Sequence, residues 1–187
     1  MEILEALDQT FARTHAIIAG ASPEQLGEPT PCAEWAVRDL LEHTIGVVAG
    51  MAAAAAGRPM PESFVLGAEP AAQFQEAAAA AMAAWRSPGA MDRIIDGGAG
   101  PMPGHVLAGI NLLDTATHCW DLAKSTGQDA NLPDDVAVAA LGAAKMIVQP
   151  EIRTGRFGPA VTAEGAGPTE QLVAFLGRRP WTAGCPI

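Results

Sequence analysis

The spacing of apolar residues predicts helices along most of this chain. In the first of them, residues 2–19, apolar side chains recur at helical intervals at Ile3, Leu4, Leu7, Phe11, Ile17 and Ile18. The same spacing predicts a helix at about 35–56, and proline, glycine and alanine signals predict further helices at about 69–86, 104–125, 133–148 and 169–176. Proline- and glycine-rich segments separate them at 21–31, 57–61 and 87–104, the last with a short extended piece at 91–95. We therefore expect an all-α protein, a four-helix bundle with extra C-terminal helices and loops, as a single domain over residues 1–187.

The composition agrees with helices in close contact. Hydrophobic residues make up 49% of the chain and charged residues 17%, which excludes a disordered protein. Alanine is abundant, aromatic residues reach only 5%, and tyrosine is absent. A core built from such small side chains favours closely packed helices over a β-sandwich.

The charge balance and the apolar segments exclude several partners. Acidic residues outnumber basic ones by 21 to 11, a net charge of −10, which argues against nucleic acid and anionic membrane surfaces. The weakly polar run Thr44–Ala56 is shorter than the ~20 residues that span a bilayer, and the N-terminus lacks the pattern of a signal peptide. Cys32, Cys119 and Cys185 form no CxxC pair. We therefore expect a reducing, cytoplasmic location.

Candidate chemistry lies in the predicted helix 104–125. Asp114 and His118 stand four residues apart, so both project from one face and can converge on a metal ion. On a helical wheel, an apolar stripe lies on one side, and the opposite side is a polar face formed by Asp114, Thr117, His118, Asp121 and Ser125. The alternative is therefore a solvated face with a local Asp–His pair. His43, on the flank of the helix 35–56, has a similar alternative as a structural histidine.

Four strings of residues resemble a known family. They are TPCAEWAVRDLLEH at 30–43, HCWDLAKSTGQ at 118–128, FGPAV at 157–161 and LVAFLGRRPW at 172–181. Together they resemble the mycothiol-dependent maleylpyruvate isomerase metal-binding domain family, and in particular its short single-domain members. That resemblance implies a DinB-like four-helix bundle.

The resemblance also implies a metal site formed by His43, Asp114 and His118. The isomerase has glutamate where this chain has Asp114, which shortens that ligand by one methylene, and glycine is usual where this chain has Cys119. Cys119 is rotated by ~100° from His118 around the helix, so we do not expect it among the ligands. Two histidines and a carboxylate favour zinc, with an open coordination position, although nickel, iron or manganese also suit them.

The implied function is a metal-dependent enzyme that uses a low-molecular-weight thiol, mycothiol, for isomerisation or thiol transfer on a small electrophile. The isomerase carries a further C-terminal domain with no counterpart here, so we do not expect maleylpyruvate isomerisation itself and leave the substrate open. The alternative is a non-catalytic metal-binding or interaction protein, in which the alanine-rich faces at 49–56 and 77–84 form a homodimer interface. A third possibility is a helical domain with no metal at all.

Other residues have simpler interpretations. We expect Trp35 to pack at the start of its helix and Arg38 and Asp39 to form an ion pair there. Cys32 is interpreted as a small packed cysteine, with a reactive thiol as the alternative. His105 is expected to be exposed or to cap a loop.

Overall fold

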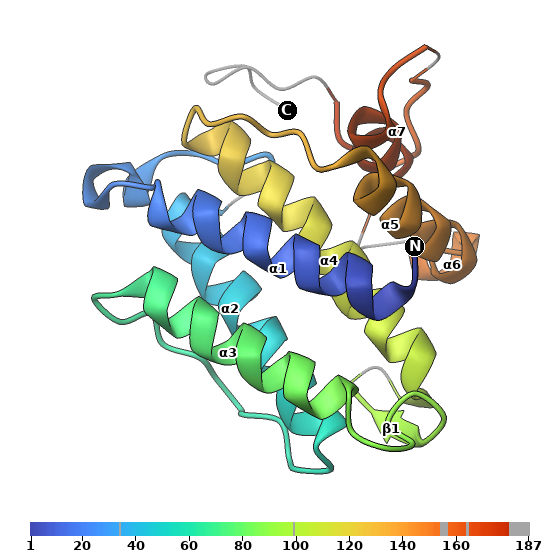
Figure 1. Ribbon diagram of the computed structural model, residues 1–187. Coiled ribbons are helices and arrows are strands. Elements are labelled where there is room, and N and C mark those ends of the chain that lie inside the picture. Colours follow the sequence, from blue (N-terminus) through green and yellow to red (C-terminus); the bar gives the residue numbers. More distant parts are fainter. Residues whose placement is uncertain (34, 99, 154–156, 164, 180–187) are drawn as a thin grey trace.

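The computed structural model describes residues 1–33, 35–98, 100–153, 157–163 and 165–179, and it confirms the all-α fold. Four long helices, α1 (Ile3–Ala19), α2 (Val37–Ala55), α3 (Pro70–Trp85) and α4 (Gly104–Ser125), form a bundle (Figure 1). Their bounds lie within two residues of the predicted ones. None of the helices in these described ranges is both long and apolar enough to cross a membrane.

The helices of the bundle are arranged so that α1 and α2 lie diagonally opposite each other. α1 packs against α3 and α4, and α2 packs against the same two helices. α1 and α4 run in one direction, and α2 and α3 run in the other (Figure 1). The neighbours α2 and α3 are therefore parallel, so the connection between them, residues 56–69, has to return along the bundle.

Two glycines of α2 allow that return segment to pack closely. A Cβ atom on Gly46 would lie 2.9 Å from the Cβ of Phe64, and one on Gly50 would lie 2.7 Å from the Cε of Met60. At Gly46 a side chain would push the Phe64 residue away, whereas at Gly50 it would displace only the terminal methyl of the flexible Met60 side chain. The first of these glycines is less than one helical turn from His43.

The alanine-rich faces meet inside the chain. α2 and α3 pack against each other, and the buried core includes alanines of both helices, among them Ala52, Ala55, Ala77 and Ala81. Small side chains at this contact let the two helix axes approach closely. Most of the alanine surface that was considered for a homodimer is therefore covered by the protein's own helices.

Helix α4 occupies the centre of the molecule, and this overturns the solvated-face alternative. It packs against α1, α2, α5 (Asp134–Ile147) and α7 (Pro168–Phe175). His118 is 8% exposed and Asp121 is completely buried. The polar side of α4 is covered by α2, which brings His43 to Asp114, and by the segment after α7, from which Arg178 contacts Asp121.

The remaining elements are short. A 3-10 helix (Pro23–Gly27), β1 (Ile94–Asp96), β2 (Pro101–Pro103) and α6 (Pro150–Arg153) lie in the connections. β1 overlaps the predicted extended piece and pairs antiparallel with β2 in a two-stranded sheet. The 3-10 helix, β2 and α6 were not predicted.

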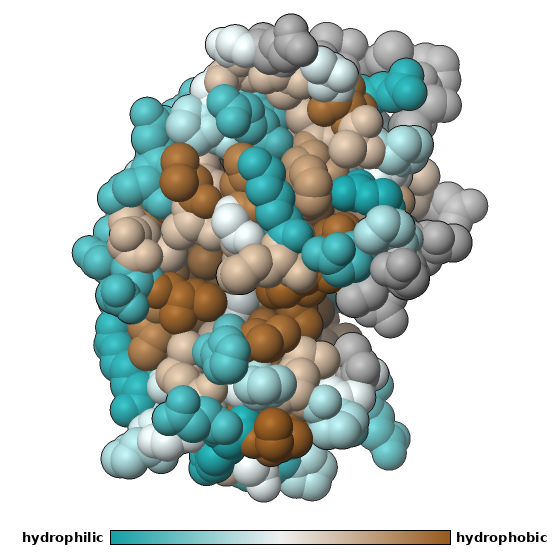
Figure 2. Space-filling view, turned by 90° about the vertical axis from the view of Figure 1, so that its right-hand side faces the viewer, coloured by the Kyte–Doolittle hydropathy of each residue, from teal (hydrophilic) through white to brown (hydrophobic). Residues whose placement is uncertain are grey.

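The surface carries apolar side chains in separate patches. Figure 2 shows the side at the right of Figure 1, where brown patches are divided by polar side chains. Exposed apolar residues of the molecule include Ile94, Val138 and Met146. Single exposed apolar residues of this kind are normal for a globular protein.

Gly104, the first residue of α4, provides a test of the fold. A Cβ atom there would overlap the carbonyl oxygen of Ala90, and the Gly104 amide donates to the carbonyl of Arg93 at 2.8 Å. We expect Gly104→Ala to lower the free energy of unfolding by about 1–3 kcal/mol. Denaturant unfolding followed by circular dichroism measures this change.

The matched control is Gly142→Ala, because Gly142 lies inside α5 with no atom within 4 Å of an added Cβ. There alanine should raise the free energy of unfolding by about 0.4–1 kcal/mol. Equal effects of the two substitutions would contradict the close contact at the start of α4.

Candidate metal centre

The structure brings the three predicted ligands together between α2 and α4. His43 comes from α2, and Asp114 and His118 come from successive turns of α4. The Nε2 atoms of both histidines lie 3.6 Å from Oδ1 of Asp114, and the two imidazole rings are nearly perpendicular, with centroids 4.9 Å apart. One nitrogen or oxygen of each residue lies within 4.8 Å of the others.

These distances match a metal site better than a set of hydrogen bonds. At 3.6 Å a nitrogen–oxygen pair is too long for a good hydrogen bond. Ligand atoms in a tetrahedral zinc site lie about 3.3 Å apart, given bond lengths of about 2.0–2.1 Å. The second carboxylate oxygen of Asp114, Oδ2, is buried and has no hydrogen-bond partner among the described residues. A buried carboxylate oxygen without a donor is costly, so the donor set fits a cation.

The cluster is closed on one side and open on the other. The side chain of His118 is 10% exposed, that of Asp114 22% and that of His43 32%. Access from solvent is therefore greatest beside His43. Trp35 lies next to this opening, with its ring centroid 4.8 Å from that of His43 and 6.2 Å from that of His118. Its predicted packing at the start of α2 thus includes both histidine rings.

Thr30 shapes the loop that carries Trp35 and Cys32. Its side chain is almost completely buried, and its hydroxyl lies 3.0 Å from the carbonyl oxygen of Cys32 and 2.9 Å from that of Trp35. The same oxygen accepts a hydrogen bond from the Cys32 amide at 3.1 Å. A short polar side chain that bonds to nearby backbone groups is typical of such turns. The loop therefore presents both residues to the histidine cluster.

A second group of polar residues lies on the other side of the His118 ring. Nδ1 of His118 is 2.9 Å from Oδ2 of Asp121, and Nη2 of Arg178 donates to the same oxygen at 2.8 Å. The Cys32 thiol donates to Asp121 at 3.4 Å and lies 3.9 Å from Nδ1 of His118. Cys32 is thus partly buried in a polar cluster. Cys32, His118 and Asp121 form a second trio with the spacing of metal ligands. The Asp121 carboxylate, however, already forms an ion pair with Arg178.

Sequence reasoning did not single out Asp121 or Arg178. Asp121 carries a local signal, since it follows His118 by three residues and so shares its helix face. Arg178 carries no such signal, because only the tertiary fold brings it to α4. Cys185 lies outside the described residues.

Burial and charge shift the pKa values of this cluster. Burial opposes ionisation of Asp121, but Arg178 and His118 outweigh it and lower the pKa of Asp121 to about 2. Burial likewise opposes protonation of His118, but the charge of Asp114 and the hydrogen bond to Asp121 raise the pKa of His118 to about 10. The pKa of Asp114 is lowered, against its burial, by the charges of His118, His43 and Arg178. The metal-free site therefore holds two carboxylates and a protonated His118.

Other candidate residues lie apart from this cluster. Cys119 is 2% exposed, and burial raises the pKa of its thiol to about 11. His105 is exposed, with Nδ1 3.2 Å from the carbonyl oxygen of Met91, and lies nine residues before Asp114, about 13 Å along the helix. The expected pair of Arg38 and Asp39 is wrong, because adjacent helical residues point in different directions.

Arg38 and Asp39 each have another partner, within one turn of the same helix. Arg38 lies 3.9 Å from Glu42, one turn further along α2. The Asp39 carboxylate accepts a hydrogen bond of 2.9 Å from the Ala36 amide, which satisfies a donor at the start of the helix.

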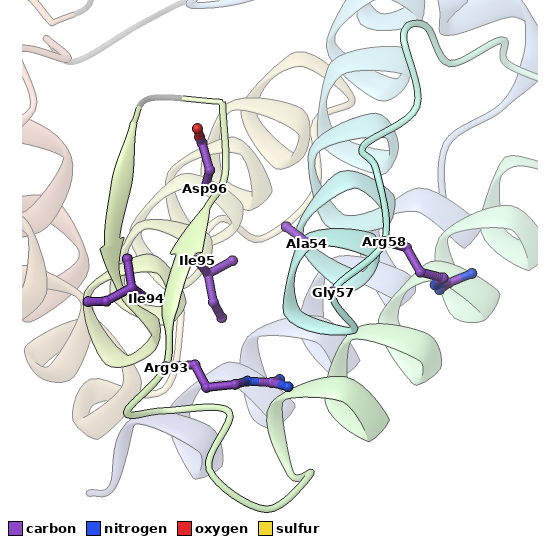
Figure 3. Close-up of a pocket in the computed structure, with 7 residues that line it drawn as sticks. All are labelled: Ala54, Gly57, Arg58, Arg93, Ile94, Ile95 and Asp96. Carbon is purple, nitrogen blue, oxygen red and sulfur yellow. The ribbon is translucent and has the colours of Figure 1, made fainter.

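A pocket of about 270 Å³ lies at the other end of α2, between the end of that helix and β1 (Figure 3). Its lining includes Ala54, Gly57, Arg58, Arg93 and Ile95. Nη2 of Arg93 donates to the carbonyl oxygen of Ala55 at 2.7 Å. This contact satisfies a carbonyl in the last turn of α2, so the arginine has a structural role there.

Fold and site together describe a helical bundle with a His, Asp and His cluster between two of its helices. Residues 7–123 match the model of the mycothiol maleylpyruvate isomerase N-terminal domain, a range that contains α2 and α3, most of α1 and α4, and all three clustered residues. The chain therefore belongs to this family.

Two curated relatives come from Mycobacterium tuberculosis. They are "Uncharacterized protein MT0763" of strain CDC 1551 and "Uncharacterized protein Rv0738" of strain H37Rv. Each is 38% identical to this chain over 171 residues, which is 87% of this chain and 90% of the relative. No solved structure matches the chain.

The pKa of His118 leads to a pH-dependence for the metal-free protein. A pKa raised from 6.5 to about 10 adds stability that is complete below pH 6.5 and is lost as the pH rises towards 10. We expect the urea midpoint of the protein in a chelator to fall steadily between pH 6.5 and pH 9.

The comparison is with His118→Gln, which should show a much flatter profile in this range, while His105→Gln should follow the wild type. A similar fall in the wild type and in His118→Gln would contradict the assignment of the proton to His118.

Proposed function

We propose that the protein binds one divalent metal ion, zinc in the first place, through His43, Asp114 and His118. We further propose that it acts with a low-molecular-weight thiol, mycothiol, on a small electrophile in the cytoplasm. The observation that carries the proposal is the convergence of two histidine nitrogens on the Asp114 carboxylate, whose second oxygen is buried without a hydrogen-bond partner among the described residues.

The open side of the cluster supports an enzyme site over a closed structural site. Structural zinc is held by four protein ligands, whereas catalytic zinc has three and leaves a position for water or substrate. Here three residues converge, and the partly exposed His43 marks the side from which a small molecule can enter. Trp35 provides an apolar wall at this entrance.

The charges of the three ligands suit an anionic thiolate. Asp114 contributes one negative charge and the two histidines contribute none when they bind a metal. With a divalent ion the centre therefore has a net charge of +1, and a bound metal of this kind lowers the pKa of a thiol so that it is present as thiolate. His43, Asp114 and His118 would hold the ion, and the partly exposed side of His43 leaves room for a small electrophile to approach.

The choice of mycothiol as the thiol rests on the family match. The matched domain is named after mycothiol and maleylpyruvate isomerase, so mycothiol is the first thiol to test. The free thiols Cys32 and Cys119 suit a reducing compartment in which such a thiol is present. Isomerisation and thiol transfer both begin with attack of the thiolate on an electrophile, so the choice between them depends on the substrate.

Metal analysis tests the site. Protein purified without chelator or affinity tag should contain about one equivalent of zinc or another divalent ion, because three ligands converge. His43→Ala and His118→Ala should each lose it, and Asp114→Asn should retain less than Asp114→Glu, which keeps the carboxylate. Inductively coupled plasma mass spectrometry measures the content.

The control is His105→Ala, which removes an exposed histidine at the other end of α4 and should keep the metal. Wild-type protein with less than a tenth of an equivalent, unchanged after incubation with zinc, would refute the metal site.

A thiol-consumption assay tests the chemistry. Zinc-loaded protein should accelerate the loss of mycothiol in the presence of halonitroarenes, which release halide as the thioether forms, relative to the metal-free protein. His43→Ala should reduce the rate to the metal-free level, since it removes one of the three proposed ligands. A metal-loaded wild type with no acceleration would favour the non-catalytic metal-binding alternative.

A further inference from the structure

Asp121 contacts His118 on the ring nitrogen that faces away from the other two candidate ligands. Nε2 of His118 is directed towards Asp114 at 3.6 Å, whereas Nδ1 lies 2.9 Å from Oδ2 of Asp121. The Asp121 side chain is completely buried, so water does not compete for this contact. The imidazole is therefore held at both nitrogens, and only the contact at Nδ1 has the length of a good hydrogen bond.

This arrangement selects one tautomer of His118. A histidine that binds a metal through Nε2 needs a free electron pair there, and so carries its remaining proton on Nδ1. A carboxylate that accepts a hydrogen bond from Nδ1 favours that tautomer and fixes the plane of the ring. Asp121 is placed to do both.

Arg178 holds the Asp121 carboxylate with two of its nitrogens. Nη2 donates to Oδ2 at 2.8 Å and Nε donates to Oδ1 at 3.3 Å. The guanidinium is 13% exposed, so this ion pair lies largely out of water and has a defined geometry. Arg178 lies outside residues 7–123, the part of the chain that matches the family model.

The backbone around Arg178 explains how the C-terminal segment reaches α4. Gly177 has φ of 88°, and the Arg178 amide donates to the carbonyl of Val173 at 2.9 Å, which ends α7 with a tight turn. A Cβ atom on Gly177 would lie 2.6 Å from Cα of Gly158, so the two glycines allow backbone contact. Nη1 of Arg153 then donates to the carbonyl oxygens of Gly158 and Phe175.

These contacts give a role to two strings that the metal ligands leave unexplained. FGPAV at 157–161 and the sequence LVAFLGRR at 172–179 meet at the two glycines, and Val161 donates to the carbonyl of Ala174 at 2.8 Å. Together they place the Arg178 side chain over the buried carboxylate.

We propose that Asp121 is a positioning residue for the metal ligand His118 and that Arg178 fixes Asp121, so that the C-terminal segment forms part of the metal centre. This inference rests on the proposed function, because it needs His118 to bind a metal. On this proposal, the affinity of the site for metal depends on the C-terminal segment as well as on the bundle helices.

A double-mutant cycle in metal affinity tests this. Zinc dissociation constants are measured by chelator competition for the full-length wild type, Asp121→Asn, Arg178→Gln and the double variant. Asp121→Asn should bind about 10- to 100-fold more weakly, and Arg178→Gln about 10-fold. The double variant should be no weaker than Asp121→Asn, because Arg178 acts through Asp121.

The matched control is Arg179→Gln, which removes the same charge from the adjacent, exposed arginine and should leave the affinity unchanged. Nitrogen-15 NMR of the imidazole provides a readout that loss of stability does not move. Zinc-loaded wild type should show the proton on Nδ1 of His118, and Asp121→Asn should show a weaker hydrogen bond at that position. Circular dichroism confirms that each variant is folded.

The outcomes separate this inference from the proposed function. A wild type that binds zinc, with Asp121→Asn and Arg178→Gln within threefold of it, would overturn the positioning role and leave the metal site intact. Additive effects in the double variant, or an equal loss in Arg179→Gln, would overturn the action of Arg178 through Asp121. A wild type without zinc affinity would overturn both.

Discussion

The imidazole of His118 lies between two carboxylates inside the bundle, and the arrangement of the site depends on this contact. Asp114 and Asp121 are on the same helix as His118, at four residues before it and three after it, so α4 alone places all three groups. Their burial is tolerated because the charges compensate. Two carboxylates are matched by the Arg178 guanidinium and the His118 proton, and a divalent ion in place of that proton raises the net charge by one.

Four separate parts of the chain contribute to this one cluster. α2 provides His43, the loop before it provides Cys32 and Trp35, α4 provides the central acids and imidazole, and the segment after α7 provides Arg178. A buried polar group needs partners from whatever surrounds it, since water is absent. The segment after α7 therefore does more than cover α4, because it supplies the charge that the buried Asp121 requires.

Most of the fold could be predicted from the sequence, because apolar side chains recur at helical spacing in α1 and α2 and because proline and glycine mark the ends of the other helices. The 3-10 helix and α6 are too short for such a pattern to appear. Spacing placed Asp114 and His118 on one face, and resemblance added His43. Arg178 was not predicted because it meets Asp121 across 57 positions of the sequence. The polar face of α4 was open to misinterpretation, since an amphipathic pattern does not show whether further helices cover it.

The division of the clustered residues between two antiparallel helices links ligand binding to the stability of the whole bundle. A cation shared by His43 and His118 would tie α2 to α4, so it would bind the folded chain and not the unfolded one. By mass action, free metal at a hundred times its dissociation constant would add about 2.7 kcal/mol to the free energy of unfolding. The stability of the folded bundle would then depend on the concentration of free metal around the protein.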